Sequence, residues 1–403
     1  MTRSRLDRRQ DVPPDNPWNH PAMSSRYVLN TKVYPIDGGH LLSMGDLLDY
    51  FRQHGSLRVS DLHLKTGSPP IYRVDGSLQK MKGPSLTAEV IGKLVESLLS
   101  DAELEELKEK RSTDSSCMTE TMQFRLNIFY ENDGLAAAIR ALEATAPALE
   151  NIGFPNGVWR DIVNKQQGLV LVTGITGAGK STTIASLIDR IAETRPCRII
   201  TLEDPIEYRL KSKAALISQR EVGRDVPSYE RGLRDCLRED PDVIFVGEMR
   251  DRESTTWTLT AAETGHLVFS TLHTRDARGT VTRALDMFPP NQQDEVASQL
   301  SLGLSHIISQ KLIPRADGQG RVVAMEVLNN IYSVANLIRL NKTEQLYSQL
   351  QTRTKDIPSE RMVTMERSLV ELIRRGTVAP LEAEKWANNP TAFLDEMKRG
   401  DLA

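Results

Sequence analysis

The most specific chemical feature of this sequence is a glycine-rich segment that ends in a lysine and a serine. Residues 174–181 read GITGAGKS and match the phosphate-loop pattern G-x-x-x-x-G-K-[ST] between a predicted strand and a predicted helix. In such a loop the backbone N–H groups bind phosphate oxygens, the lysine reaches the β and γ phosphates, and the hydroxyl binds Mg²⁺. The alternative is a glycine-rich turn without a ligand. We expect ATP and Mg²⁺ here, bound by Gly174, Thr176, Gly177, Ala178, Gly179, Lys180, Ser181 and Thr182.

Three carboxylates follow a second predicted strand, in the segment LEDPIEY at residues 202–208. In an open parallel sheet the carboxyl ends of the strands form the edge at which ligands bind. Glu203 can accept the proton of an attacking water, while Asp204 or Glu207 can organise metal-bound water. The alternative is a solvated acidic turn bounded by Pro205.

A third predicted strand also ends in a carboxylate. Residues 240–251 read DPDVIFVGEMRD, an arrangement of the Walker-B type in which Glu248 can reach Mg²⁺ through water. Gly247 stands where an aspartate is usual in such a motif. The alternative is a plain strand followed by a charged turn. If the Walker-B interpretation holds, magnesium is bound by Glu248 together with Ser181 of the phosphate loop.

Two histidines flank a fourth apolar run, in the segment TGHLVFSTLHT. His266 and His273 are seven residues apart, which in an extended strand is about 23 Å, so they cannot bind one metal ion as a pair. A structural role is the ordinary one for a lone histidine. The alternative is a hydrogen bond from a histidine at the strand end to the γ-phosphate, which suits His273 beside Thr271 and Thr274.

Four short apolar runs, separated by helical stretches, must position these residues. Their apolar character is continuous rather than alternating, which predicts strands buried on both faces and hence a parallel sheet covered by helices. The fold class of this part is therefore α/β. The runs lie at residues 168–173, 198–202, 243–247 and 266–272, and a further strand is predicted at 321–328.

The length of 403 residues favours two domains. A helical pattern from Met44 and strands at 124–130 and 135–140 indicate a small α+β domain before the α/β domain. The basic, proline-rich start indicates a flexible leader, and the charged end is mostly helical. We predict a leader at 1–43, an N-terminal domain at 44–150, a linker at 151–157, the α/β domain at 158–330 and a helical C-terminal region at 331–403.

Composition narrows the possible partners. With 51 basic and 54 acidic residues the chain is nearly neutral, and nothing in it calls for a nucleic-acid or membrane partner. Three cysteines without a CxxC pair argue against a structural zinc site or a disulfide framework, and they fit a reducing cytoplasm. No apolar run approaches the roughly 20 residues needed to cross a bilayer. We expect no direct membrane insertion, so any membrane association must come through a partner.

Taken together and in this order, the phosphate loop, the acidic box, the Walker-B box and the histidine box resemble those of the secretion-superfamily ATPases, specifically the PilT-type ATPases that retract type IV pili. The resemblance runs from about residue 44 to residue 353. It implies a PAS-like N-terminal domain and a RecA-like P-loop ATPase domain. It also implies that Glu203 is the general base, that Glu248 supports magnesium, and that His266 and His273 belong to the catalytic set.

Two arginines enter the predicted site through this resemblance. Arg125 and Arg140 match family arginines that project from the N-terminal domain toward the nucleotide; taken alone, they would be read as surface residues. The family's assembly branch usually carries a tetracysteine zinc insert, which is missing here and favours the retraction branch. The segment SVANLIRL at 333–340 keeps the NLIR of the AIRNLIRE typical of retraction ATPases, but Ala335 and Leu340 replace its first arginine and its glutamate.

The function implied by this resemblance is that of a homohexameric motor that hydrolyses ATP and powers pilus retraction, and so twitching motility, by nucleotide-driven domain rotation. Its expected partners are an inner-membrane platform protein and the rest of the pilus machinery, which would place it in the cytoplasm and peripheral to the inner membrane. Two alternatives stay open. One is a type IV secretion ATPase for conjugation or effector export, and the other is a nucleotide-sensing ring subunit without turnover.

Overall fold

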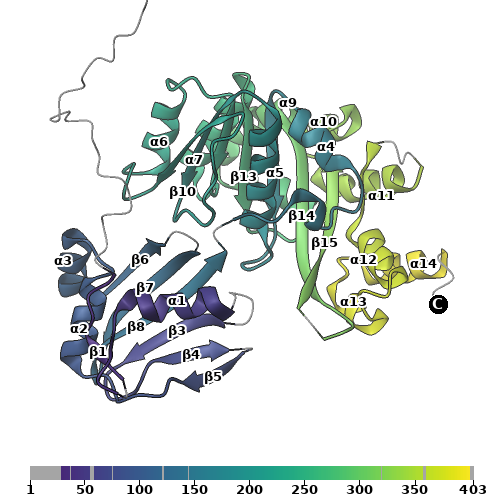
Figure 1. Ribbon diagram of the computed structural model, residues 1–403. Helices are drawn as coiled ribbons and strands as arrows, with labels where there is room; N and C mark the ends of the chain where they lie inside the picture. The colour runs from purple at the N-terminus through teal and green to yellow at the C-terminus, as the bar shows by residue number, and fades with distance from the viewer. Residues whose placement is uncertain are drawn as a thin grey trace, which may run out of the picture. The chain divides into compact units, whose positions relative to one another are not determined.

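The chain divides into two compact units, Met1–Glu143 and Ala144–Ala403, each with its own sheet and hydrophobic core (Figure 1). The predicted linker at 151–157 lies inside the second unit. The computed structural model describes residues 29–36, 38–54, 59–74, 76–119, 122–143, 145–318, 320–356 and 360–399.

The first unit contains a six-stranded antiparallel sheet in the order β5-β4-β3-β8-β7-β6. In Figure 1, α1 lies across one face of this sheet. Phe51 of that helix and Phe124 of β7 are buried together, their ring centroids 5.3 Å apart. The elements are α1 (Met44–His54), β3 (Val59–Lys65), β4 (Ile71–Val74), β5 (Ser77–Lys80), α2 (Ala88–Glu96), α3 (Asp101–Lys110), β6 (Ser112–Met118), β7 (Met122–Glu131) and β8 (Gly134–Glu143).

Residues 29–36 and 38–43, which the sequence had placed in the leader, are folded onto the first unit. β1 (Tyr34–Pro35) pairs with β2 (Leu41–Leu42). The Tyr34 ring is fully buried, and its hydroxyl donates a hydrogen bond of 2.8 Å to the carbonyl of Pro84. The sequence signal failed here because scattered apolar residues around the buried Tyr34 ring, rather than a periodic pattern, hold this segment. The rest of the predicted leader, residues 1–28 and 37, lies outside the described residues.

The second unit contains a seven-stranded sheet in the order β11-β10-β12-β13-β9-β14-β15, parallel except for the antiparallel β15. Five of its strands are the predicted ones. The sequence did not predict β11 and β14, because polar residues interrupt their apolar character. The strands are β9 (Gly168–Thr173), β10 (Arg198–Glu203), β11 (Leu216–Glu221), β12 (Val243–Val246), β13 (Leu267–Leu272), β14 (Leu304–Pro314) and β15 (Arg321–Asn329).

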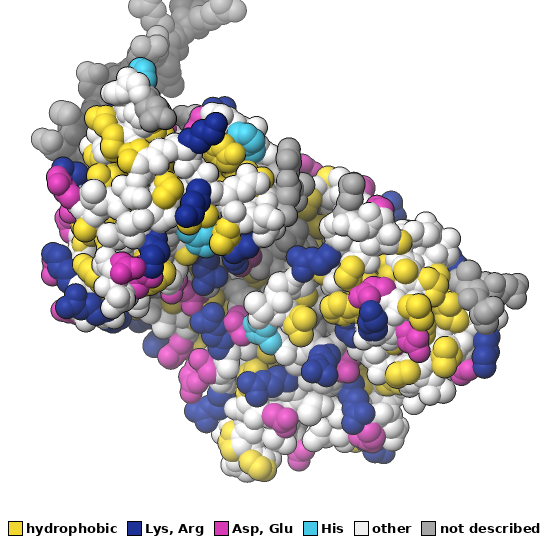
Figure 2. Space-filling model, turned by 90° about the horizontal axis from the view of Figure 1, so that it is seen from below, with side chains coloured by type: hydrophobic (Ala, Val, Ile, Leu, Met, Phe, Trp, Pro, Cys, Tyr) yellow, Lys and Arg dark blue, Asp and Glu magenta, His cyan; other side chains and the backbone are white. Residues whose placement is uncertain are grey.

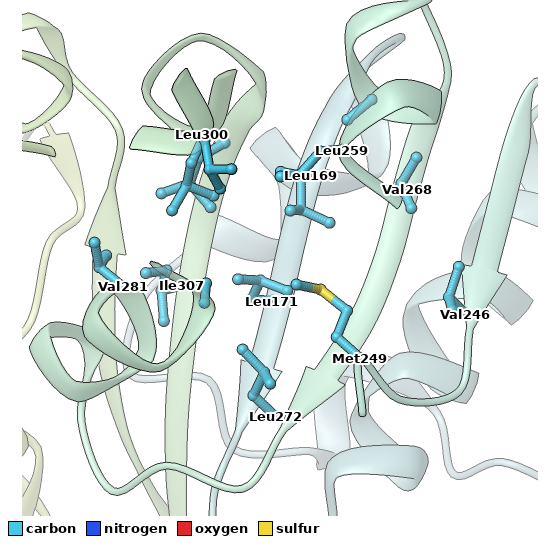
Figure 3. Close-up of a cluster of buried hydrophobic side chains, with 14 of the residues drawn as sticks. Leu169, Leu171, Val246, Met249, Leu259, Val268, Leu272, Val281, Leu300 and Ile307 are labelled. Carbon is cyan, nitrogen blue, oxygen red and sulfur yellow. The ribbon is translucent and has the colours of Figure 1, made fainter. Parts of the chain in front are cut away.

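Both faces of this sheet are covered, as the continuous apolar runs predict. Along β9, Leu169 and Leu171 belong to one buried cluster, which Figure 3 shows extending to Leu300 of α9. The intervening Val170 and Val172 belong to a second cluster on the opposite face. The predicted α/β class is confirmed. The covering helices are α4 (Val158–Asn164), α5 (Lys180–Thr194), α6 (Tyr229–Cys236), α7 (Arg252–Glu263), α8 (Ala277–Asp286) and α9 (Pro290–Gly303).

The chain after β15 is mainly helical. Helices α12 and α14 pack with the end of the β14–β15 pair around a separate buried cluster that includes Ile313, Leu369 and Phe393 (Figure 1). No helix among the described residues is both long enough and apolar enough to cross a bilayer. These helices are α10 (Tyr332–Arg339), α11 (Leu346–Asp356), α12 (Met365–Arg374), α13 (Pro380–Trp386) and α14 (Pro390–Arg399).

Candidate functional site

The predicted phosphate loop connects the end of β9 to the start of α5, as the motif requires. Gly174 has φ of +151°, and a Cβ at this position would lie 2.5 Å from the carbonyl oxygen of Gln310. Gly179 precedes the first residue of α5 and is left-handed, with φ of +85°. Only glycine fits both positions without strain or a clash. The loop conformation therefore depends on the glycines that the motif specifies.

Lys180 is the first residue of α5, and its side chain turns back into the loop. The residue is only 9% exposed, and Nζ donates hydrogen bonds to the carbonyls of Gly174 at 3.0 Å and Ile175 at 3.3 Å. Burial lowers the pKa of Lys180, while the charges of Glu248 and Glu207 act in the opposite direction. The ammonium thus has carbonyl partners that phosphate oxygens can replace.

Two hydroxyl residues, Ser181 and Thr182, follow Lys180 in the first turn of helix α5. Ser181 and Thr182 are half-buried, and the Thr182 hydroxyl lies 2.8 Å from that of Tyr208, whereas Thr176 and Gly177 are exposed on the loop. Among the residues that the structure describes, no three His, Cys, Asp or Glu side chains form a metal-binding group. The two predicted ligands, the Ser181 hydroxyl and the Glu248 carboxylate, still fit Mg²⁺, because magnesium bound with nucleotides takes one or two protein ligands and completes its shell with phosphate oxygens and water.

Glu203 ends strand β10 and is buried at the carboxyl edge of the sheet, with 7% of its surface exposed. Its Oε1 accepts hydrogen bonds from the Thr201 hydroxyl at 2.7 Å and from Nε2 of Gln219 at 3.0 Å. Burial raises the pKa of Glu203 to about 7, although these hydrogen bonds act to lower it. A carboxyl group with this pKa can take up and release a proton near neutral pH.

Glu248 follows β12, the strand next to β10, and each of its carboxylate oxygens lies beside a side-chain nitrogen. Its Oε1 lies 3.3 Å from Nε2 of His273, and its Oε2 accepts a hydrogen bond of 2.9 Å from Nε of Arg250. The other ring nitrogen of His273 lies 3.5 Å from Nζ of Lys180. Arg250 also donates to Asp204 at 2.9 Å. The structure thus brings the phosphate-loop lysine, the Walker-B carboxylate and the strand-end histidine together.

The local structure explains why glycine, and not the usual aspartate of the motif, occupies position 247. A Cβ at this position would lie 2.7 Å from the hydroxyl oxygen of Tyr229 and 3.2 Å from the carbonyl oxygen of Leu202. The Gly247 N–H also donates to that same carbonyl at 2.8 Å. A side chain at 247 would separate β12 from β10, so the carboxylate of this box comes one residue later, at Glu248.

The structure does not bring every predicted residue to this edge. His266 precedes β13 at the opposite end of the strand from His273. Its Nδ1 lies 2.9 Å from the carbonyl oxygen of Ala261 and 3.1 Å from the hydroxyl of Thr264. These contacts close the turn between α7 and β13, and they do not connect His266 with the phosphate loop.

Arg125 and Arg140 belong to the first unit, whereas the phosphate loop belongs to the second. They lie opposite each other on β7 and β8, on the sheet face that carries polar residues. Nε of Arg140 donates to Oδ1 of Asp61 at 2.8 Å, and Arg73 lies 3.7 Å from the other oxygen of Asp61. Asp61 therefore forms ion pairs with both Arg73 and Arg140. The Arg140 side chain is nevertheless 66% exposed.

Sequence reasoning missed three residues that hold the site: Gln219, Arg250 and Gln310. Gln219 and Gln310 lie on β11 and β14, the two strands that the apolar pattern did not reveal. Arg250 stands two residues after Glu248, and a charge-pair reading of the EMRD segment would have identified it. Figure 2 shows a face on which basic and acidic side chains are interspersed. A charged residue is therefore identified as part of the site by its hydrogen-bond and ion-pair partners and not by its charge alone.

The phosphate loop, the buried carboxyl group and the Walker-B carboxylate at one sheet edge define a P-loop nucleotide-binding site. A family model described as "Type II/IV secretion system protein" matches residues 56–391 of this chain. The match covers well over half of the sequence. The protein therefore belongs to the type II/IV secretion system protein family.

Within that family, the chain is similar to proteins of pilus retraction. It is 40% identical over 353 residues to the type IV pilus retractation ATPase PilT of Pseudomonas aeruginosa, covering 87% of this chain and 100% of PilT. It is 42% identical over 340 residues to a twitching motility protein of Neisseria gonorrhoeae, covering 83% of this chain and 90% of that protein. A crystal structure of the pilus retraction motor PilT with bound ADP superposes with a TM-score of 0.79 at 42% identity, covering 87% of this chain and 99% of that one. These findings confirm the predicted resemblance to PilT-type ATPases.

Proposed function

We propose that this protein is an ATPase motor that powers the retraction of type IV pili. The observation that carries the proposal is the convergence of Lys180, Glu248 and His273 at the phosphate loop, with the near-neutral carboxyl of Glu203 at the end of the neighbouring strand β10. Whole-length similarity to a retraction ATPase and to a twitching motility protein supports the pilus as the load.

Each group of the site has a distinct task in this mechanism. The loop N–H groups and Lys180 bind the nucleotide phosphates, and the Ser181 hydroxyl together with Glu248, through water, would hold Mg²⁺. The bound metal ion would supply charge neutralisation at the phosphates. Glu203 accepts a proton from the attacking water, and its raised pKa suits that exchange. His273 lies between Lys180 and Glu248, where its ring can hydrogen-bond to the γ-phosphate.

We further propose that six copies form a closed ring, because a head-to-tail interface that closes generates a ring with equivalent sites. In that ring Arg125 and Arg140 act on the nucleotide from the N-terminal, PAS-like domain. Nucleotide-driven rotation of the two units then performs work on the pilus through an inner-membrane platform protein. This role places the protein in the cytoplasm, at the membrane through its partner.

The test of the enzymatic proposal is turnover and ADP binding by the full chain and three variants. Glu203→Gln should bind ADP normally and release phosphate about 10²-fold to 10⁴-fold more slowly, since a general base contributes a factor of this size. Lys180→Ala should lose ADP binding. Glu105→Gln, on the exposed surface of α3, is the matched control and should keep both activities. Normal turnover in Glu203→Gln would refute the assignment of the base.

The test of the cellular proposal is a deletion strain examined for its pili. Unretracted pili and lost twitching are expected, and both should be restored by the unaltered gene but not by the Lys180→Ala variant. A strain with normal pili that has lost conjugation or effector export would instead establish a type IV secretion ATPase. ADP binding without any turnover by the unaltered ring would establish a nucleotide sensor.

A further inference from the structure

Gln310 is a buried polar residue in the middle of β14, beside the phosphate loop. It is 2% exposed, and both ends of its side-chain amide are hydrogen-bonded. Its Nε2 donates to the carbonyl of Ala178 at 2.6 Å, and its Oε1 accepts from the Thr183 hydroxyl at 3.0 Å. One side chain therefore binds the loop just before Lys180 and the first turn of α5 just after it.

The backbone around Gln310 also shapes the entrance to the loop. Its carbonyl oxygen occupies the space that a Cβ of Gly174 would need, and its Nε2 lies 3.2 Å from where a Cβ of Gly179 would stand. One residue earlier, the hydroxyl of Ser309 lies 2.8 Å from that of Thr173, its register partner on β9. Gly174 and Gly179 of the motif thus leave room for the backbone carbonyl and the side-chain amide of Gln310.

Strand β14 is itself held from its other side. The next residue, Lys311, donates hydrogen bonds of 2.6 Å to the carbonyl of Trp386 and to Oδ1 of Asn388, both in the C-terminal region. Strand β15 pairs with β14 along its whole length. Gln310 therefore projects from a strand that is anchored on both edges, as a residue that positions another element must be.

We propose that Gln310 is a positioning residue of the ATP site. Its hydrogen bonds with Ala178 and Thr183 hold the phosphate loop in the conformation that binds phosphate. This inference rests on the proposed ATP-binding function. Gln310 acts through the loop rather than on the nucleotide, since its Oε1 accepts from Thr183 and its Nε2 donates to the Ala178 carbonyl. The position calls for a donor and an acceptor two methylenes from the backbone, which glutamine supplies and methionine, of similar length, does not.

The test compares ADP binding by calorimetry for the full-length protein and its variants. Gln310→Met removes both hydrogen bonds at nearly constant volume and should weaken ADP binding about tenfold, which corresponds to about 1.4 kcal/mol. Thr183→Val removes one bond and should weaken it about threefold, an effect of the size of one neutral hydrogen bond. Thr258→Val, which deletes an equally buried hydroxyl bonded within α7, should leave the affinity within about twofold.

The double variant Gln310→Met/Thr183→Val separates positioning from general stability. If Gln310 acts through this bond, the double variant should bind ADP no more than about twofold more weakly than Gln310→Met, because the shared bond is already lost. A purely structural role would lower the folded fraction, and hence the number of binding sites, with an unchanged dissociation constant. An unchanged constant in Gln310→Met, or independent effects in the double variant, would overturn the proposal. Failure of the unaltered protein to bind ADP would refute the proposed function itself and this inference with it.

Discussion

Replacing Glu203 by glutamine should stabilise the folded protein above pH 7 and change little at pH 4.5. Burial raises the pKa of Glu203 from 4.5 to about 7. As the pH rises through this window the unfolded chain loses the proton first, so the folded state binds more protons and the free energy of unfolding falls. Above pH 7 both states are ionised and the folded protein carries the full penalty. Glutamine does not ionise and avoids it.

The size of the effect follows from the two pKa values. Each pKa unit corresponds to about 1.4 kcal/mol, so the difference between 4.5 and about 7 makes the ionised carboxylate unfavourable by about 3 kcal/mol. The glutamine amide oxygen can still accept the hydrogen bonds from Thr201 and Gln219. The gain above pH 7 should therefore approach about 3 kcal/mol. Glu326, whose pKa burial also raises to about 7, titrates alike in both proteins and leaves the difference unchanged.

The assay is urea unfolding of the full chain at pH 4.5 and pH 8, followed by tryptophan fluorescence. Three of the four tryptophans, Trp159, Trp257 and Trp386, lie in the second unit with Glu203. Trp18, which precedes the described residues, is replaced by phenylalanine in every protein compared, so that the signal reports on the affected domain. Glu105→Gln on the exposed surface of α3 is the control and should shift neither transition. A stabilisation of Glu203→Gln that is the same at both pH values, or a destabilisation at pH 8, would refute the reasoning.

Two further substitutions test the residues that support the site. Gly247→Ala should lower the free energy of unfolding by about 1 to 3 kcal/mol, because the alanine Cβ would lie only 2.7 Å from the Tyr229 hydroxyl. In thermal unfolding, adding Tyr229→Phe to this variant should recover part of the loss. An alanine variant as stable as the unaltered protein would contradict the predicted clash. Asp61→Asn should destabilise the first unit by about 1 kcal/mol at pH 7 and less at pH 3. Burial acts to raise the pKa of Asp61, but hydrogen bonds from Ser60 and Arg140 outweigh burial and hold the pKa below its usual value. Acid therefore removes the stabilising charge of Asp61 in the native protein. Hydrogen exchange at the two pH values measures the stability difference, and a pH-independent difference would count against the prediction.

Local patterns were sufficient for the parts of the fold whose environment is uniform. The strands β9, β10, β12 and β13 are buried on both faces, and their unbroken apolar runs revealed them. Where burial is mixed with polar contacts the pattern failed. Strand β14 carries buried Ser309 and Gln310, whose partners come from β9 and from the phosphate loop. A polar residue in sequence is ordinarily exposed, and only its hydrogen bonds show that it is not.

The candidate site divides in the same way. Lys180, Ser181, Glu203 and Glu248 were identifiable because each belongs to a short motif with its own chemistry. His273 was left between two interpretations, and its position between Lys180 and Glu248 favours the functional one. The matching prediction for His266 gains no such support, since its ring closes a turn at the other end of β13.

The phosphate-loop pattern by itself determined that this protein carries a nucleotide-type site, because backbone conformation and lysine reach are properties of eight consecutive residues. The apolar runs likewise determined the parallel sheet that presents the loop. Only the tertiary structure decided how the loop is held and how its neighbours titrate. The near-neutral pKa of Glu203 comes from burial, and the clamp by Gln310 comes from a strand more than 120 residues further along the chain. Burial and long-range hydrogen bonds exist only once distant segments pack together, so no local pattern encodes them.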